Sequence, residues 1–196
     1  PAPRLPPSQG ARLIAIAGNP ASAAALKHLR AVFPEVPFVG MEPAVKPAAE
    51  QTHTRKVGVL ATPSTFHGEL YASVVERFAQ DVGIFQSTCP GLVSQIEKAR
   101  LNTPKTRRIL EEAVRPMLDA GADTLVMGCT HYPFVIPLIE KIAAGRARVI
   151  DPAPAVARQT ARVLAERNLL NPSPIEGSLR FLTSGEAARF EYALSR

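Results

Sequence analysis

Short apolar runs alternate with longer amphipathic stretches along this chain, and this alternation constrains the fold more than any other feature. A parallel strand buried on both faces gives a short apolar run, whereas a helix repeats its apolar residues about every 3.6 positions. The alternation therefore predicts βαβ units around a mostly parallel sheet, an α/β fold. The expected strands are residues 12–17, 36–39, 57–61, 82–86, 123–127, 147–150 and 179–183. The expected helices are residues 21–30, 45–52, 65–78, 91–100, 105–120, 134–143, 154–168 and 186–194.

The composition is that of an ordinary globular protein, with 46% hydrophobic and 20% charged residues in 196. Gly, Pro or a charged residue interrupts the apolar runs well short of the roughly 18 residues that a membrane span needs, so we expect no membrane partner and a cytoplasmic location. Cys89 and Cys129 lack both CxxC spacing and a histidine at metal-ligand spacing. We therefore expect neither a disulfide framework nor a metal site.

The formal net charge of +6 raises the question of a nucleic-acid partner. The 23 Lys and Arg residues are scattered, and the densest patch, between Lys98 and Arg108, has no interleaved aromatic residues. No nucleic-acid-binding motif accompanies the patch, so a solvated surface is the better interpretation, and we expect no nucleic-acid partner.

The segment Leu125–Pro133, LVMGCTHYP, carries the clearest chemical signal, because an apolar strand runs directly into a Gly-Cys-Thr-His turn. Gly128 allows a sharp exit from the strand and places Cys129 at its carboxyl end, the usual place for α/β sites. A following helix would favour thiolate over thiol, and His131 could supply or take a proton. A small buried cysteine beside an ordinary loop histidine is the alternative, and spacing alone leaves both open.

LVMGCTHYP resembles the second cysteine motif of the glutamate racemase family, within the aspartate/glutamate racemase superfamily. Other stretches resemble the family in the same order along residues 12–193: Val57–Thr65 (VGVLATPST), Cys89-Pro90, Val149–Pro152 (VIDP) and Phe181–Gly185 (FLTSG). The resemblance implies two similar lobes with mostly parallel sheets flanked by helices. It also implies interconversion of L- and D-glutamate for peptidoglycan synthesis, without a cofactor.

Such a reaction removes a weakly acidic α-proton from one face of the substrate and returns a proton to the other, so it needs two opposed acid–base groups. Cysteine suits both roles because its pKa, near 8.5 when free, can be tuned. By resemblance, Cys129 and His131 are catalytic, and Asn19, Thr65 and Thr130 contact the substrate glutamate. Thr65 is equally well explained as a helix-cap residue, and Asn19 as a turn former before proline.

One departure from the family affects catalysis directly. The family's first cysteine lies in an Ala-Cys-Asn-Thr-Ala-Ser motif, whereas residues 17–22 read AGNPAS, so Gly18 replaces the cysteine. Pro20 also replaces a threonine and removes a hydroxyl and a backbone donor. With a thiol on one face only, we expect no racemase turnover from this chain. A non-catalytic descendant that binds an acidic amino acid or a partner protein is the alternative function.

A second departure concerns the family's opening Asp-Ser-Gly and Pro-Tyr-Gly loops, because neither string occurs here. Residues 1–11 are Pro-rich and are expected to be disordered or a linker. By resemblance, residues 12–56 plus 150–196 form an incomplete first lobe, and residues 57–149 form the second lobe. An incomplete lobe exposes a sheet edge, which favours aggregation, domain exchange or a homodimer.

Overall fold

Two parallel sheets organise the part of the chain that the computed structural model describes, residues 10–173 and 175–195. The larger sheet has the order β4-β3-β5-β6, formed by Gly83–Ser87, Lys56–Leu60, Thr124–Met127 and Arg148–Ile150. The smaller sheet pairs β1 (Ile14–Ala15) with β2 (Phe38–Val39). Each of these strand pairs is parallel, which confirms the α/β class. Of the segments expected to be linkers, residues 1–9 and Pro174 lie outside the described residues.

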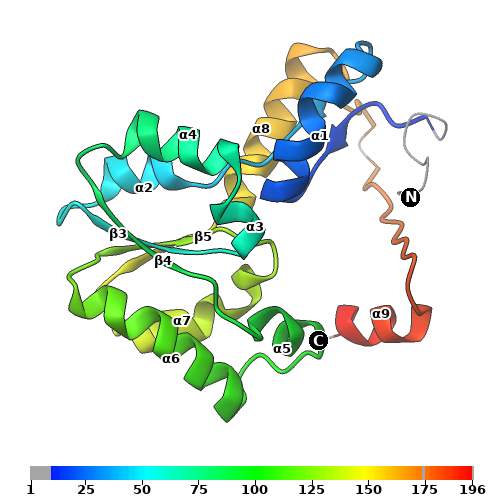
Figure 1. Ribbon diagram of the computed structural model, residues 1–196. Coiled ribbons are helices and arrows are strands. Elements are labelled where there is room, and N and C mark those ends of the chain that lie inside the picture. The colour runs from blue at the N-terminus through cyan, green and yellow to red at the C-terminus, as the bar shows by residue number, and fades with distance from the viewer. Residues whose placement is uncertain (1–9, 174, 196) are drawn as a thin grey trace.

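Helices cover both faces of the larger sheet (Figure 1). One face carries α2 (Val45–Gln51) and α4 (Glu69–Phe78), and the other carries α6 (Pro104–Asp119) and α7 (Ile136–Ala143). Side chains alternate between the faces: Val126 packs in the core with α2 and α4, whereas Leu125 and Met127 pack in the core with α6 and α7. Burial on both faces explains why these strands are continuous apolar runs.

The smaller sheet is accompanied by α1 (Asn19–Val32) and α8 (Ala153–Glu166) (Figure 1). Ser22 of α1 donates a 3.2 Å hydrogen bond from its hydroxyl to the Ile16 carbonyl and accepts one of 2.9 Å from the Met41 backbone N–H. Ser22 therefore ties the segments that follow β1 and β2 together. The division of the chain into two lobes stays a prediction, and α2, from the expected first lobe, packs in the same core as β3.

Two expected helices are each divided. The helix expected at residues 65–78 is two helices, α3 (Pro63–Phe66) and α4, because Gly68 is extended between them and glycine is a poor helix former. The helix expected from Phe134 begins with a 3₁₀ turn, η2 (Tyr132–Val135), and Pro137 lies in the first turn of α7. The remaining helices are α5 (Leu92–Glu97) and α9 (Ala187–Leu194).

The strand expected at residues 179–183 is wrong. These residues have no regular structure, and Leu179 and Phe181 are 85% and 58% exposed. The segment leads from α8 to α9 outside both sheets (Figure 1). A strand forms only where a neighbouring strand accepts its backbone hydrogen bonds, and no described strand pairs with this segment.

Candidate active site

Loops from three neighbouring strands meet at the carboxyl edge of the larger sheet, where α/β proteins commonly place their sites. Gly128 follows β5, and its backbone N–H donates a 2.7 Å hydrogen bond to the Leu60 carbonyl of β3. A Cβ atom on Gly128 would lie 2.7 Å from the Ala61 Cβ atom and 3.1 Å from the Leu60 oxygen. This close approach requires glycine and brings the β3 and β5 loops together.

Three side chains form a line beside Gly128. The Cys129 sulfur lies 3.7 Å from Nδ1 of His131, and Nε2 of His131 lies 3.3 Å from a carboxylate oxygen of Glu97, the last residue of α5. The thiol is half-buried, whereas the Glu97 side chain is 53% exposed. An imidazole placed in this way can take the thiol proton, and a carboxylate stabilises the imidazolium that results.

The backbone N–H groups of the turn favour a Cys129 thiolate, as expected, but their effect on the pKa is not the largest one. Burial raises the pKa of the Cys129 thiol, and this effect outweighs the backbone N–H groups of His131 and Tyr132, which lower it. The turn also leads into a short 3₁₀ helix, whose dipole is smaller than that of an α-helix of several turns. Cys129 therefore rests as a thiol, and forming the thiolate needs a proton acceptor such as His131.

Cys89 has the character of a packed thiol. It is 2% exposed, its sulfur lies 3.7 Å from the Ser87 hydroxyl, and burial raises its pKa to about 11. The buried Tyr132 donates a 3.0 Å hydrogen bond from its hydroxyl to the Thr88 carbonyl. This bond fixes the Cys89 loop to the turn that carries Cys129.

Asn19 connects the smaller sheet to the same turn. It is 4% exposed, and its Nδ2 donates a 2.9 Å hydrogen bond to the carbonyl oxygen of Gly128. Its Oδ1 atom is buried and has no hydrogen-bond partner within the described part of the chain. The residue after Gly18 therefore bonds the residue before Cys129.

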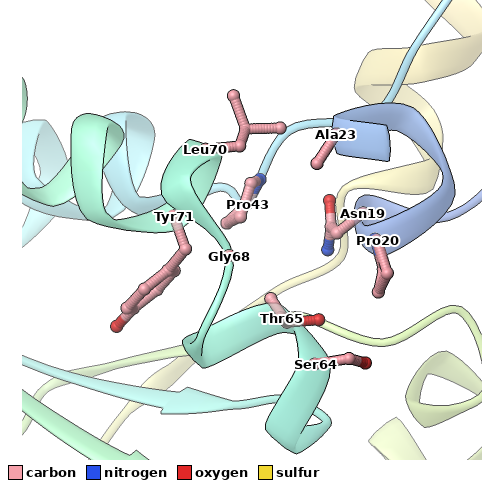
Figure 2. A pocket seen from close by; sticks show the side chains of 9 residues that line it. All are labelled: Asn19, Pro20, Ala23, Pro43, Ser64, Thr65, Gly68, Leu70 and Tyr71. Atoms are coloured by element: carbon pink, nitrogen blue, oxygen red, sulfur yellow. The ribbon is translucent and has the colours of Figure 1, made fainter. Parts of the chain in front are cut away.

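A small pocket opens beside Asn19 and also involves the β3 loop. Figure 2 shows the side chains of Asn19 and Thr65 near one another, with Ser64, Gly68 and Tyr71 around the same pocket. Thr65 is 3% exposed, and its hydroxyl lies 3.2 Å from that of Thr62, the N-cap residue of α3. The Thr62 side chain does not cap the backbone of α3, so the hydroxyls of this loop bond one another.

Nothing in the backbone at Gly18 requires glycine. Its φ of −178° and ψ of 128° are extended values that any residue adopts. A Cβ atom there would find only the Ala21 Cβ atom nearby, at 3.7 Å, an ordinary contact. A Cβ atom therefore fits at this position without moving the chain.

The structure places Cys129 and His131 in contact and brings Asn19 and Thr65 to one pocket, whereas Thr130 is exposed on the turn. Sequence reasoning missed Glu97. It lies 34 residues from His131 in sequence, and no local motif marks it. The signal for Tyr132 was present, since this residue belongs to the LVMGCTHYP segment.

Among residues 10–173 and 175–195, no three His, Cys, Asp or Glu side chains gather in a way that could hold a metal ion. No helix there has both the length and the apolar character needed to cross a membrane.

These features define an α/β protein with two parallel sheets. A thiol, an imidazole and a carboxylate lie in a line where the two sheets meet. The model of the Asp/Glu/Hydantoin racemase family matches residues 2–160. The chain belongs to this family.

Within this family, the chain is similar to relatives and solved structures that are named glutamate racemases. The chain is 47% identical over 190 residues to a glutamate racemase of Roseiflexus sp. (strain RS-1), covering 96% of this chain and 70% of that protein. It superimposes on a glutamate racemase isoform from Bacillus anthracis with a TM-score of 0.77 and 25% identity, covering 93% of this chain and 68% of the other. A glutamate racemase from Francisella tularensis, crystallised with D-glutamate, gives a TM-score of 0.70 and 26% identity, covering 85% of this chain and 62% of the other.

Proposed function

We propose that this chain binds glutamate and acts on its α-carbon without a cofactor. This is the chemistry by which a glutamate racemase interconverts L- and D-glutamate for peptidoglycan synthesis. The observation that carries the proposal is the Cys129–His131–Glu97 line, which begins one residue from the Asn19–Gly128 hydrogen bond. The names of the relatives and the D-glutamate bound to the Francisella racemase support the choice of substrate.

In this proposal Cys129 takes or gives the α-proton on one face of glutamate. His131 accepts the proton of the thiol, and Glu97 stabilises the imidazolium. The position of His131 suits this role, because its two ring nitrogens contact Cys129 and Glu97 and its side chain is 36% exposed.

Asn19, Thr65 and Thr130 hold the substrate in the same proposal. The first turn of α1 lines the pocket beside Asn19, and the amino end of a helix favours a carboxylate. The buried, unpartnered Oδ1 of Asn19 can accept a hydrogen bond from an ammonium group. Thr130 is exposed on the turn that carries Cys129.

Gly18 leaves the opposite face without a thiol, so we further propose that this chain does not racemise glutamate by itself. Inversion needs a second acid, and glycine has no side chain to provide one. The comparisons do not favour the alternative of a non-catalytic binding protein, because the relatives carry the name of an enzyme.

Two measurements on the purified chain test these proposals. Saturation-transfer NMR should detect binding of glutamate, and binding should weaken several-fold in Asn19→Ala while Asn102→Ala, an exposed control, leaves it unchanged. Circular dichroism of L- and D-glutamate incubated with the chain should show no racemisation. Absence of binding refutes the proposed substrate, and turnover that Cys129→Ala abolishes refutes the loss of racemisation.

We also propose a cytoplasmic location and a homodimer. No residue of α8, which the structure describes throughout, is buried, and Leu179, Phe181 and Leu182 are exposed. Apolar side chains left in water favour association with a second copy. Light scattering over a range of protein concentrations tests this, and a monomer at every concentration contradicts it.

A further inference from the structure

Two adjacent residues of the Cys129 turn reach the same neighbouring segment, residues 88–97, which runs from the end of β4 through α5. Tyr132 donates a 3.0 Å hydrogen bond from its hydroxyl to the Thr88 carbonyl, at the start of this segment. Nε2 of His131 lies 3.3 Å from a carboxylate oxygen of Glu97, at its end. The turn therefore contacts the segment at two points, and one of them is the carboxylate contact of the candidate site.

The 88–97 segment has little structure of its own to fix its position. Cys89 has a φ of 45°, in the left-handed region that a residue with a Cβ atom adopts only at a cost in free energy. Helix α5 is six residues long and has no side-chain cap at its amino end, and a helix of that length is unstable in isolation. The position of α5 beside the site therefore depends on contacts with neighbouring elements.

Apolar packing supplies part of that support. Leu92 and Ile96 of α5 are buried in the same core cluster as Tyr132. Apolar packing is not directional, so it holds α5 near the turn without fixing the position of the helix along its axis. A hydrogen bond has a preferred length and direction. The bond from Tyr132 to Thr88 therefore fixes the loop that enters α5 more closely than packing does.

The Tyr132 hydroxyl is suited to a permanent bond of this kind. Its side chain is fully buried, and burial raises the pKa of Tyr132 further above that of a free tyrosine. The hydroxyl therefore stays protonated and remains a donor at any pH at which the thiol of Cys129 reacts. Removal of the hydroxyl would leave the Thr88 carbonyl without this donor, which costs free energy where water has limited access.

We propose that Tyr132 is a positioning residue that acts through Glu97. The bond from its hydroxyl to Thr88 holds α5 where Glu97 meets His131. Since Glu97 stabilises the His131 imidazolium, this bond also affects how readily the thiol of Cys129 loses its proton. The inference rests on the Cys129–His131–Glu97 line of the proposed function and adds the residue that sets its geometry.

The experiment measures the rate at which iodoacetamide alkylates Cys129 near neutral pH, with mass spectrometry to locate the modified cysteine. Tyr132→Phe keeps the buried ring and removes only the hydroxyl. It should slow alkylation about two- to fivefold, the range for loss of a partly exposed charge pair. Tyr192→Phe, at an exposed position of α9, is the control and should leave the rate unchanged. A variant that merely loosened the fold would expose the thiol and speed its reaction.

A double variant tests whether Tyr132 acts through Glu97. In the Glu97→Gln background, Tyr132→Phe should slow alkylation little further, because the contact that the hydroxyl positions is already weakened. In the background of Glu112→Gln, an exposed glutamate paired with Arg108 on α6, Tyr132→Phe should have its full effect. An effect of the hydroxyl that bypassed Glu97 would be the same in both backgrounds.

Two further measurements locate the change. Amide hydrogen exchange in Tyr132→Phe should rise in residues 88–97 and stay the same in α2 and α4, which pack in the other core cluster. Ser87→Ala loosens the same loop, because the Ser87 hydroxyl accepts a 3.4 Å hydrogen bond from the Cys89 backbone N–H. It should also slow alkylation of Cys129, and it decides the question if Tyr132→Phe does not fold. Melting temperatures show that each variant is folded.

The outcomes separate this inference from the proposed function. Slower alkylation in Glu97→Gln but not in folded Tyr132→Phe overturns the inference and leaves the proposed function in place. A full additional slowing by Tyr132→Phe in the Glu97→Gln background also overturns it, because the hydroxyl then acts independently of the carboxylate. An unchanged rate in Glu97→Gln overturns the proposed role of Glu97, and the inference with it. None of these rates depends on glutamate, whose binding is measured separately.

Discussion

Asn19 donates a 2.9 Å hydrogen bond from its side-chain amide to the carbonyl oxygen of Gly128, although the two residues are 109 positions apart in sequence. Gly18 precedes the first of these residues, and Cys129 follows the second. One buried contact thus links the segment that carries Gly18 to the turn that carries Cys129.

Asn19→Ala should destabilise the protein by about 1–3 kcal/mol, because it leaves the Gly128 carbonyl without its side-chain donor. Urea unfolding followed by circular dichroism measures the free energy of unfolding. Asn102→Ala, at an exposed position, serves as the control and should change this free energy by less than about 0.5 kcal/mol. Equal effects of the two substitutions would show that the contact is unimportant.

Cys129 should react with iodoacetamide about tenfold or more faster than Cys89, because Cys129 is half-buried whereas Cys89 is 2% exposed with a pKa of about 11. Burial also raises the pKa of Cys129, so its rate should keep rising above neutral pH. Mass spectrometry of quenched samples between pH 6 and 9, about the reference cysteine pKa, measures both rates. Similar rates at the two cysteines throughout would contradict an accessible Cys129.

Glu97→Gln should slow alkylation of Cys129 by about two- to fivefold near neutral pH. The neutral amide stabilises the His131 imidazolium less than the carboxylate does, and a partly exposed pair of this kind contributes about 0.5–1 kcal/mol. The same alkylation assay measures the change, with Glu112→Gln as the matched control. An unchanged rate in Glu97→Gln would mean that the carboxylate does not act on the thiol through His131.

Gly18→Cys and Gly128→Ala should differ in their effects on stability. The first places a side chain 3.7 Å from Ala21 and should change the free energy of unfolding by less than about 0.5 kcal/mol. The second brings a Cβ atom within 2.7 Å of the Ala61 Cβ atom and should cost about 1–3 kcal/mol. Urea unfolding measures both. Strong destabilisation by Gly18→Cys would show that the position is closed to a side chain.

Asp123→Asn should destabilise the protein above about pH 4, near the pKa of an unfolded Asp. Burial acts to raise the pKa of Asp123, but hydrogen bonds from Thr52, the backbone N–H groups of residues 53 and 54, and Thr124 outweigh it and lower this pKa to about 2. A lowered folded-state pKa stabilises the fold above the unfolded pKa, and this stabilisation is lost as the pH falls towards 2. Thermal melts of both proteins between about pH 2 and pH 7 should converge at the acid end. A gap that persists there would rule out the charge as its cause.

The sequence predicts the larger sheet well, because β3 and β5 are buried on both faces and therefore read as continuous apolar runs. It also locates the Cys129 turn, where a glycine required by close packing directly precedes the cysteine. The strand expected at residues 179–183 fails because local alternation cannot show whether a neighbouring strand is present. Glu97 and the raised pKa of Cys129 depend on contacts between distant segments, which no local pattern contains.

The open, extended backbone at Gly18 bears on how this position can evolve. Two of the four glycine codons differ from a cysteine codon at a single base, and a Cβ atom at this position meets no steric obstacle. The backbone at this position therefore exerts no selection for glycine over a residue with a Cβ atom. The backbone conformation at position 18 does not indicate which residue occupied it first.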